Sequence, residues 1–150
     1  MLFLMFHVGQ NRYMLDVRQV SEVLPLTGIM PISQAPKGVA GLCSYRGSLI
    51  PVLDLSELML SHPARRRMHT RIVIAQCAHT GGVPHLLGLI VEKMTETVRL
   101  EAADFRDSGT VLPQLGAIAT DRYGLVQRID LNQLLPESLR DLLFKQSIAA

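Results

Sequence analysis

The two halves of this sequence resemble each other when the chain is shifted by about 75 residues. The matched positions, in order, are Leu15, Val17, Val20, Glu22 and Leu26 with Leu89, Val91, Met94, Glu96 and Leu100, then Gly41 with Gly116, then Leu53-Asp54-Leu55 with Ile129-Asp130-Leu131. Three groups of matches in one order indicate a duplication. We therefore expect two similar subdomains, over residues 1–65 and 66–136, followed by a C-terminal helix and tail over 137–150. Neither half is large enough to bury much core alone, so the two should pack on each other.

Short apolar segments separated by glycine and proline turns make up most of the chain. Their alternation and β-branched content predict strands over 2–8, 12–17, 49–53, 71–77, 85–91, 94–100, 115–120 and 124–129, and a broken extended segment over 22–32. Helices are predicted over 54–60, 130–135 and 137–146. Many short strands with few helices are typical of an all-β fold, either barrels or a sandwich.

Two aspartates have a structural explanation at the start of predicted helices. Asp54-Leu-Ser-Glu57 and Asp130-Leu-Asn-Gln133 fit a capping box, in which the carboxylate accepts a hydrogen bond from a free backbone N–H of the first turn. We interpret both as helix caps rather than as catalytic or metal-binding groups.

Composition argues against several classes of function. The formal net charge is only +2, and aromatic residues are 5% of the chain with no Trp, which disfavours a nucleic-acid-binding surface. The apolar start MLFLMFHVG is too short to span a membrane and has no basic region before it, so we expect a cytoplasmic protein. Cys43 and Cys77 lie in apolar segments and are interpreted as buried free thiols, with a disulfide as the alternative.

No catalytic or ligand-binding motif stands out. The histidines lack the spacing of a structural zinc site, and a metal at His79 and His85 is only a minor alternative. No phosphate-binding glycine loop and no nucleophile elbow occurs. We expect no cofactor and no enzyme activity, with dispersed catalytic residues as the alternative. The basic cluster Arg65-Arg66-Arg67 fits a solvated loop, or a contact for an acidic partner or anionic lipid head groups.

The segment from Gly38 to Leu55, GVAGLCSYRGSLIPVLDL, resembles the signature of the CheW-like chemotaxis coupling family. That family shows a Gly, a short apolar run, Arg-Gly, and an apolar strand that runs into Pro-Val-x-Asp-Leu. Similar matches occur at 6–17, 20–23, 87–91 and 115–117, so the resemblance covers about residues 2 to 136. Cys43-Ser44-Tyr45 and the arginine-rich segment depart from the family pattern.

The resemblance implies two pseudo-symmetric five-stranded β-barrels with a hydrophobic groove between them. It implies a non-enzymatic adaptor that couples methyl-accepting chemoreceptors, through their cytoplasmic tips, to the regulatory domain of a CheA-type histidine kinase. Such an adaptor is recruited to membrane-associated receptor arrays without inserting into the membrane or binding nucleic acid. A small β-barrel module that binds nucleic acid or a ligand is the alternative.

Five residues are expected to bind partners, namely Arg46, Gly47, Gly41, Glu22 and Val20. At a shift of 75 the counterpart of Arg46 is Asp121, so an arginine there is not required by the repeat. We therefore expect Arg46 to contact a partner with its rigid fork of donors, the alternative being that it braces its turn by bonding carbonyls. Gly41 and Gly47 are expected to serve backbone geometry first. Val20 and Glu22 match family positions implicated in binding, the alternative being ordinary strand residues.

Overall fold

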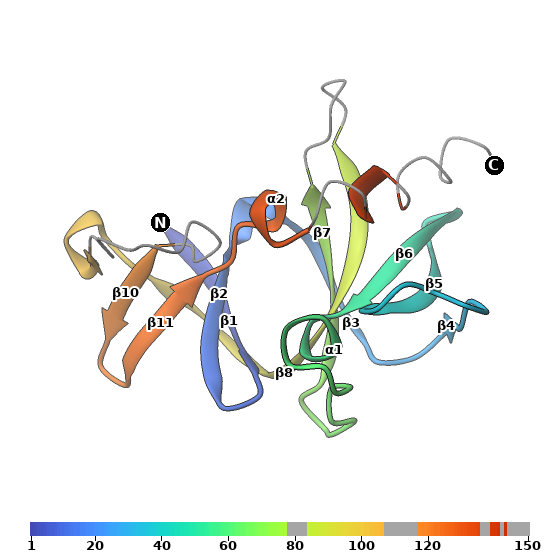
Figure 1. Cartoon of the computed structure of the whole chain (residues 1–150). Helices are drawn as coiled ribbons and strands as arrows, with labels where there is room; N and C mark the ends of the chain where they lie inside the picture. The colour runs from blue at the N-terminus through green and yellow to red at the C-terminus, as the bar shows by residue number, and fades with distance from the viewer. Residues whose placement is uncertain (78–83, 107–116, 136–138, 142, 144–150) are drawn as a thin grey trace.

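The computed structural model describes residues 1–77, 84–106, 117–135, 139–141 and 143. Strands dominate these residues and the helices among them are short, which confirms the predicted all-β class. Figure 1 shows two groups of strands side by side, with the long strand β8 (His85–Arg99) running through both.

The two groups have the same order of strand pairing. The β5 group contains β3 (Val20–Pro25), β4 (Ile29–Met30), β5 (Val39–Tyr45), β6 (Ser48–Asp54), β7 (Arg71–Cys77) and the first part of β8. The β10 group contains β1 (Leu2–Val8), β2 (Asn11–Asp16), β9 (Phe105–Arg106), β10 (Ile118–Asp121), β11 (Gly124–Arg128) and the last part of β8. In sheet order the groups read β4-β5-β6-β8-β7-β3 and β9-β10-β11-β2-β1-β8, each with its single parallel pair in the same place, β6 with β8 and β11 with β2.

The spatial groups follow a different division of the chain from the sequence repeat. The β5 group is continuous from β3 into the first part of β8, whereas the β10 group joins β1 and β2 to strands from the C-terminal half. The boundary at residue 65 remains a prediction about the repeat. Because β8 belongs to both groups, the two are tied by a continuous backbone as well as by packing.

The separate strands expected over 85–91 and 94–100 are in fact one strand, which corrects the prediction. β8 pairs with β7 up to Val91 and with β1 from Glu92 onward, and the register with β1 shifts between Met5 and His7. Lys93 has a φ of 47° at this shift. A bulge of this kind bends a strand and re-aims it without ending it, so polar residues in the middle of β8 do not form a turn.

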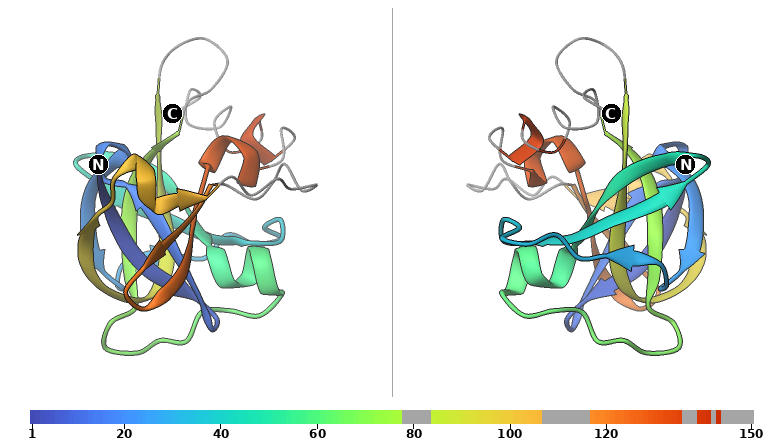
Figure 2. Two further views of the ribbon diagram at one scale, coloured as in Figure 1. Left: turned by 90° about the vertical axis from the view of Figure 1, so that its left-hand side faces the viewer. Right: turned by 90° about the vertical axis from the view of Figure 1, so that its right-hand side faces the viewer.

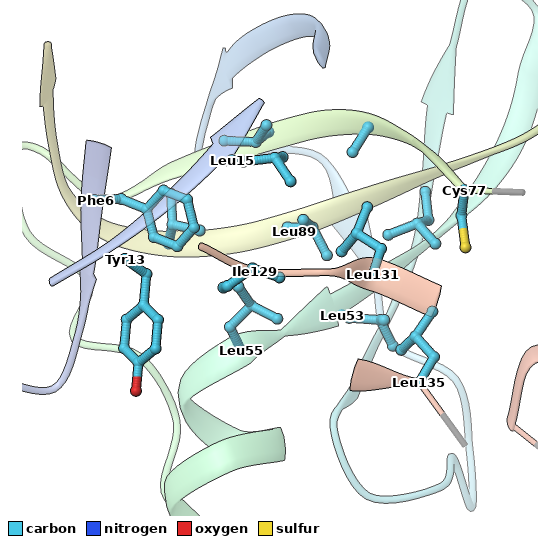
Figure 3. Packing of buried hydrophobic residues seen from close by; sticks show 14 of the residues in the cluster. Phe6, Tyr13, Leu15, Leu53, Leu55, Cys77, Leu89, Ile129, Leu131 and Leu135 are labelled. Carbon is cyan, nitrogen blue, oxygen red and sulfur yellow. The ribbon is translucent and has the colours of Figure 1, made fainter. Parts of the chain in front are cut away.

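Three apolar clusters explain why several strands read as unbroken apolar runs. Alternate residues of a strand face opposite sides. Leu4 and Phe6 of β1 face a cluster shared by both groups, while Phe3 and Met5 face a cluster within the β10 group. In β7 the alternation repeats, with one face in the shared cluster and the other in a cluster within the β5 group. Figure 3 shows the shared cluster, to which strands of both groups and the helix α2 (Leu131–Leu134) contribute.

Both predicted helix caps are confirmed. Helix α1 (Leu55–Leu60) begins after Asp54, whose carboxylate accepts from the backbone N–H groups of Ser56 and Glu57. Helix α2 (Leu131–Leu134) begins after Asp130, which accepts from the N–H of Asn132. In the predicted C-terminal helix, residues 139–141 and 143 are helical, and the remainder lies outside the described residues. Leu139 and Leu143 pack into the shared cluster.

Candidate partner-binding site

Arg46 and Gly47 form the two-residue turn between β5 and β6. The last pair of the two strands is Tyr45 with Ser48, so the turn consists of Arg46 and Gly47 alone. Both turn residues have positive φ, 49° for Arg46 and 82° for Gly47. This geometry matches the right-handed twist of a hairpin and favours Asn or Gly at the first position. An arginine in this conformation is strained by about 1–2 kcal/mol. Since Asn or Gly would make the turn more stable, the strained arginine points toward a functional role.

Glu22 of β3, a strand that pairs with β7 and not with β5 or β6, holds the Arg46 side chain. The Arg46 Nη2 lies 3.2 Å from Glu22 Oε1, and the side chains are 75% and 41% exposed. The Tyr45 hydroxyl donates to the same carboxylate oxygen at 3.2 Å, and the guanidinium carbon lies 5.2 Å from the centre of the Tyr45 ring. Within the part of the chain that the structure describes, the Arg46 side chain bonds a carboxylate and not a turn carbonyl, so the bracing alternative is not supported.

Tyr45 is the member of this cluster that sequence reasoning missed. Its ring belongs to the core of the β5 group, while its hydroxyl reaches Glu22 in a partly buried contact. Burial raises the pKa of the Tyr45 hydroxyl, and its hydrogen bond to the Glu22 carboxylate raises it further. The hydroxyl therefore stays protonated as a donor. An aromatic residue next to an Arg-Gly turn was the available signal.

A bulge separates Val20 from the cluster. Val20 pairs with Ala75 and Glu22 with Ile74, so Ser21 is the extra residue in β3. Residues paired across two strands share a face. Val20 accordingly packs against the shared cluster, as Ala75 does, while Glu22 takes the face of Ile74 and reaches Tyr45. The structure thus brings Glu22 and Arg46 together and places Val20 elsewhere.

Gly41 has a backbone role that explains why glycine is needed there. A Cβ at Gly41 would lie 2.1 Å from the carbonyl oxygen of Met30. The backbone has a φ of 153° at a register shift in β5, where β4 approaches closely. Gly47 differs, because nothing lies within 4 Å of a Cβ built on it and only its positive φ favours glycine. Partner contacts by either glycine remain a prediction. Gly116, the repeat counterpart of Gly41, lies outside the described residues.

The repeat counterpart of Arg46 is Arg122, which corrects the assignment to Asp121. β10 and β11 pair as far as Asp121 and Gly124, so Arg122 and Tyr123 form a two-residue turn that matches Arg46 and Gly47. The capping residues Asp54 and Asp130 fix the same shift of 76. The shift grows along the chain because the loops differ in length. The argument that the second half lacks an arginine here is therefore wrong.

The two equivalent turns nevertheless have different surroundings. Arg122 lies over the ring of Tyr123, at 4.9 Å from its centre. The carboxylate beside this turn is Asp121, and it pairs with Arg12 of β2 at 2.9 Å. This ion pair lowers the pKa of the Asp121 carboxyl. Of these two turns, only that of the β5 group carries an arginine that pairs with a described carboxylate, which is Glu22 of β3.

Other chemistry is sparse in the described residues. They contain no group of three or more His, Cys, Asp or Glu side chains arranged to hold a metal ion. The alternative metal site at His79 and His85 lies partly outside them. Cys43 and Cys77 are buried as thiols, and burial raises the pKa of both thiols, which disfavours the reactive thiolate. None of the described helices has the length and apolar character needed to cross a bilayer.

Comparison with known proteins places the chain in a family. The model of the CheW-like domain matches residues 2–139. The chain belongs to the CheW-like family of chemotaxis adaptors. Protein FrzA of Myxococcus xanthus is 29% identical over 83% of this chain and 73% of its own length. The chemotaxis protein CheW of Rhizobium meliloti is 23% identical over 91% and 88%. The chemotaxis protein CheW of Treponema pallidum is 24% identical over 75% of this chain, which spans 65% of that protein's length.

A solved structure confirms the fold. The scaffolding protein TtCheW from Thermoanaerobacter tengcongensis superposes with a TM-score of 0.77 at 24% identity, covering 90% of this chain and 87% of that one. This likeness in fold supports the all-β class of this CheW-like chain.

Proposed function

We propose that this CheW-like chain is a non-enzymatic adaptor that couples methyl-accepting chemoreceptors to the regulatory domain of a CheA-type histidine kinase. It would do so in the cytoplasm, at membrane-associated receptor arrays, by binding both partners through surface contacts. Membership of the family supports this proposal and favours it over a nucleic-acid-binding module.

The observation that carries the proposal for a site is the exposed, pre-positioned guanidinium of Arg46. An exposed ion pair contributes about 0.2–1 kcal/mol to stability, which is no more than the strain of the turn residue itself. Stability therefore does not explain why arginine occupies this position. A guanidinium already held by Glu22 and Tyr45 loses little freedom when a partner binds, which favours affinity. Arginine is also enriched at the residues that dominate interface energetics.

The test replaces Arg46 by a residue that suits the turn. In Arg46→Asn the backbone conformation is more favourable, so the melting temperature should stay within about 2 °C of wild type. Titration with a receptor-tip fragment and with the kinase regulatory domain should show at least about 30-fold weaker binding to one of them, corresponding to a hot-spot loss of about 2 kcal/mol.

Arg122→Asn is the matched control, because it removes an arginine from the equivalent turn. It should melt normally and retain the binding that Arg46→Asn loses. If Arg46→Asn binds both partners as wild type does, the site is wrongly assigned. If the wild-type protein binds neither partner, the proposed function itself is wrong.

A further inference from the structure

The loop between α1 and β7 has a fixed backbone although it contains three consecutive arginines. At its start the backbone N–H of Ala64 donates to the buried Asp54 carboxylate at 3.0 Å. At its end the hydroxyl of Thr70, which is 2% exposed, donates to the Arg65 carbonyl and accepts from the Arg67 N–H. The N–H of Met94 donates to the carbonyl of His69 and ties the loop to β8. Figure 2 shows the loop below the strands in both views.

The arginines of this loop carry uncompensated charge. Arg65, Arg66 and Arg67 are exposed, and no described carboxylate lies within ion-pair distance of any of them. Arg71 adds a fourth positive charge beside them and donates to the carbonyls of Met68 and Thr70. By contrast, the arginines at positions 12, 18, 46 and 128 each pair with an aspartate or glutamate. The hydrogen-bonded backbone of the loop therefore keeps several positively charged side chains close together.

A small pocket lies against the same loop. Arg66 lines it together with residues of the β3–β4 connection and of β4 and β5, which are Leu26, Thr27, Gly28, Ile29, Pro31 and Ala40. Its volume is about 180 Å³, below the roughly 300–1,000 Å³ of sites for small-molecule ligands but sufficient for one aliphatic side chain. The pocket, whose lining is about as polar as it is apolar, thus combines aliphatic residues with a guanidinium from the basic loop.

We propose that this basic loop and the adjoining pocket form a docking surface for an acidic segment of a protein partner. Carboxylates of that segment contact Arg65, Arg66 and Arg67, and an aliphatic side chain enters the pocket. Guanidinium forks match carboxylates with two parallel hydrogen bonds. The recessed pocket favours a polypeptide over a bilayer, whose surface presents head groups and gives only weak attraction to so few charges. The surface is separate from the Glu22–Arg46 cluster.

The experiment measures binding of a labelled synthetic peptide of glutamates with one central leucine to the full-length protein. The variant Arg65→Gln/Arg66→Gln/Arg67→Gln should bind at least about threefold more weakly, since each of three exposed charge pairs accounts for a factor of about 1.5 to 5. Replacing the leucine of the peptide by glycine should weaken binding by up to about tenfold. Raising NaCl from about 0.1 M to about 1 M should weaken binding as the Debye length falls from about 10 Å to about 3 Å.

A charge-matched variant separates this surface from a general attraction. Arg99→Gln/Arg106→Gln/Arg122→Gln removes the same charge from exposed positions of the β10 group and should bind the peptide as wild type does. Equal binding by the two triple variants, or no binding of the peptide to wild type, would overturn the proposal. Tighter binding of wild type to phosphatidylserine vesicles than to the peptide, lost in the loop variant, would identify a membrane surface instead. We expect Arg46→Asn to bind the peptide as wild type does. This result would show that the docking surface does not depend on the site proposed for the receptor and the kinase.

Discussion

Replacing Gly41 by alanine should destabilise the protein far more than replacing other glycines with positive φ. The added Cβ would lie 2.1 Å from the Met30 carbonyl oxygen and 2.7 Å from its carbonyl carbon. Ordinary contacts require more than 3.0 Å, so β4 must retreat by about 1 Å, an overpacking that costs about 1–3 kcal/mol. The positive φ adds about 1–2 kcal/mol. A total of about 2–5 kcal/mol corresponds to a melting temperature lower by about 5–15 °C for a chain of this size.

The assay is thermal unfolding of Gly41→Ala beside Gly47→Ala and Gly28→Ala. The two controls also have positive φ, but nothing lies within 4 Å of a Cβ at either position. They should therefore lose only the conformational contribution of about 1–2 kcal/mol. If Gly41→Ala melts together with the controls, the close approach of β4 does not constrain residue 41 and the reasoning fails.

Two further predictions concern carboxylates that accept hydrogen bonds in the folded protein. Asp54→Ala should destabilise the protein by about 2–4 kcal/mol in urea unfolding, because it leaves three N–H groups without an acceptor, those of Ser56, Glu57 and Ala64. Asp130→Ala removes a cap that accepts from one N–H, so it should lower the free energy of unfolding by only about 1 kcal/mol. Equal losses in the two variants would contradict this account. Hydrogen bonds from arginine lower the pKa of the Asp16 and Asp121 carboxyls, so the stability they contribute is present above about pH 4 and is lost as pH falls through their folded-state pKa values. The urea concentration at the unfolding midpoint should accordingly decrease when the pH is lowered below 4. The difference in this midpoint between wild type and Arg12→Met should also become smaller below pH 4, and a difference that does not change with pH would refute the assignment.

Much of the fold was predictable because it depends on local patterns. The hairpin over 2–17, the strands that became β6 and β7, and both aspartate caps follow from alternation and from helix-start chemistry. β5 was not predicted as a strand, because Gly41 interrupts its apolar pattern and the reason for that glycine lies in β4. The continuity of β8 was also missed, since a bulge with positive φ at Lys93 takes polar residues through a strand without a turn.

The candidate site was predicted in its residues but not in its geometry. Arg46 and Glu22 were each chosen from family positions, and their contact depends on the bulge at Ser21, which no local pattern reveals. Because no local pattern reveals strand register, the sequence also matched Arg46 to Asp121 instead of Arg122. The shift of 75 was taken from the match of Gly41 with Gly116, while the turn obeys the shift of 76 that strand register fixes.

The two equivalent turns show how groups of strands with the same pairing order come to present different surfaces. Both groups have a two-residue turn that begins with an arginine. In the β5 group the arginine is strained, exposed and held by Glu22 of β3. In the β10 group the carboxylate beside the turn, that of Asp121, pairs with Arg12. Tyr123, which is 65% exposed, occupies the position equivalent to Gly47. The two groups therefore present different surfaces at their equivalent turns, and differences in such contacts are what allow a protein to discriminate between unlike partners.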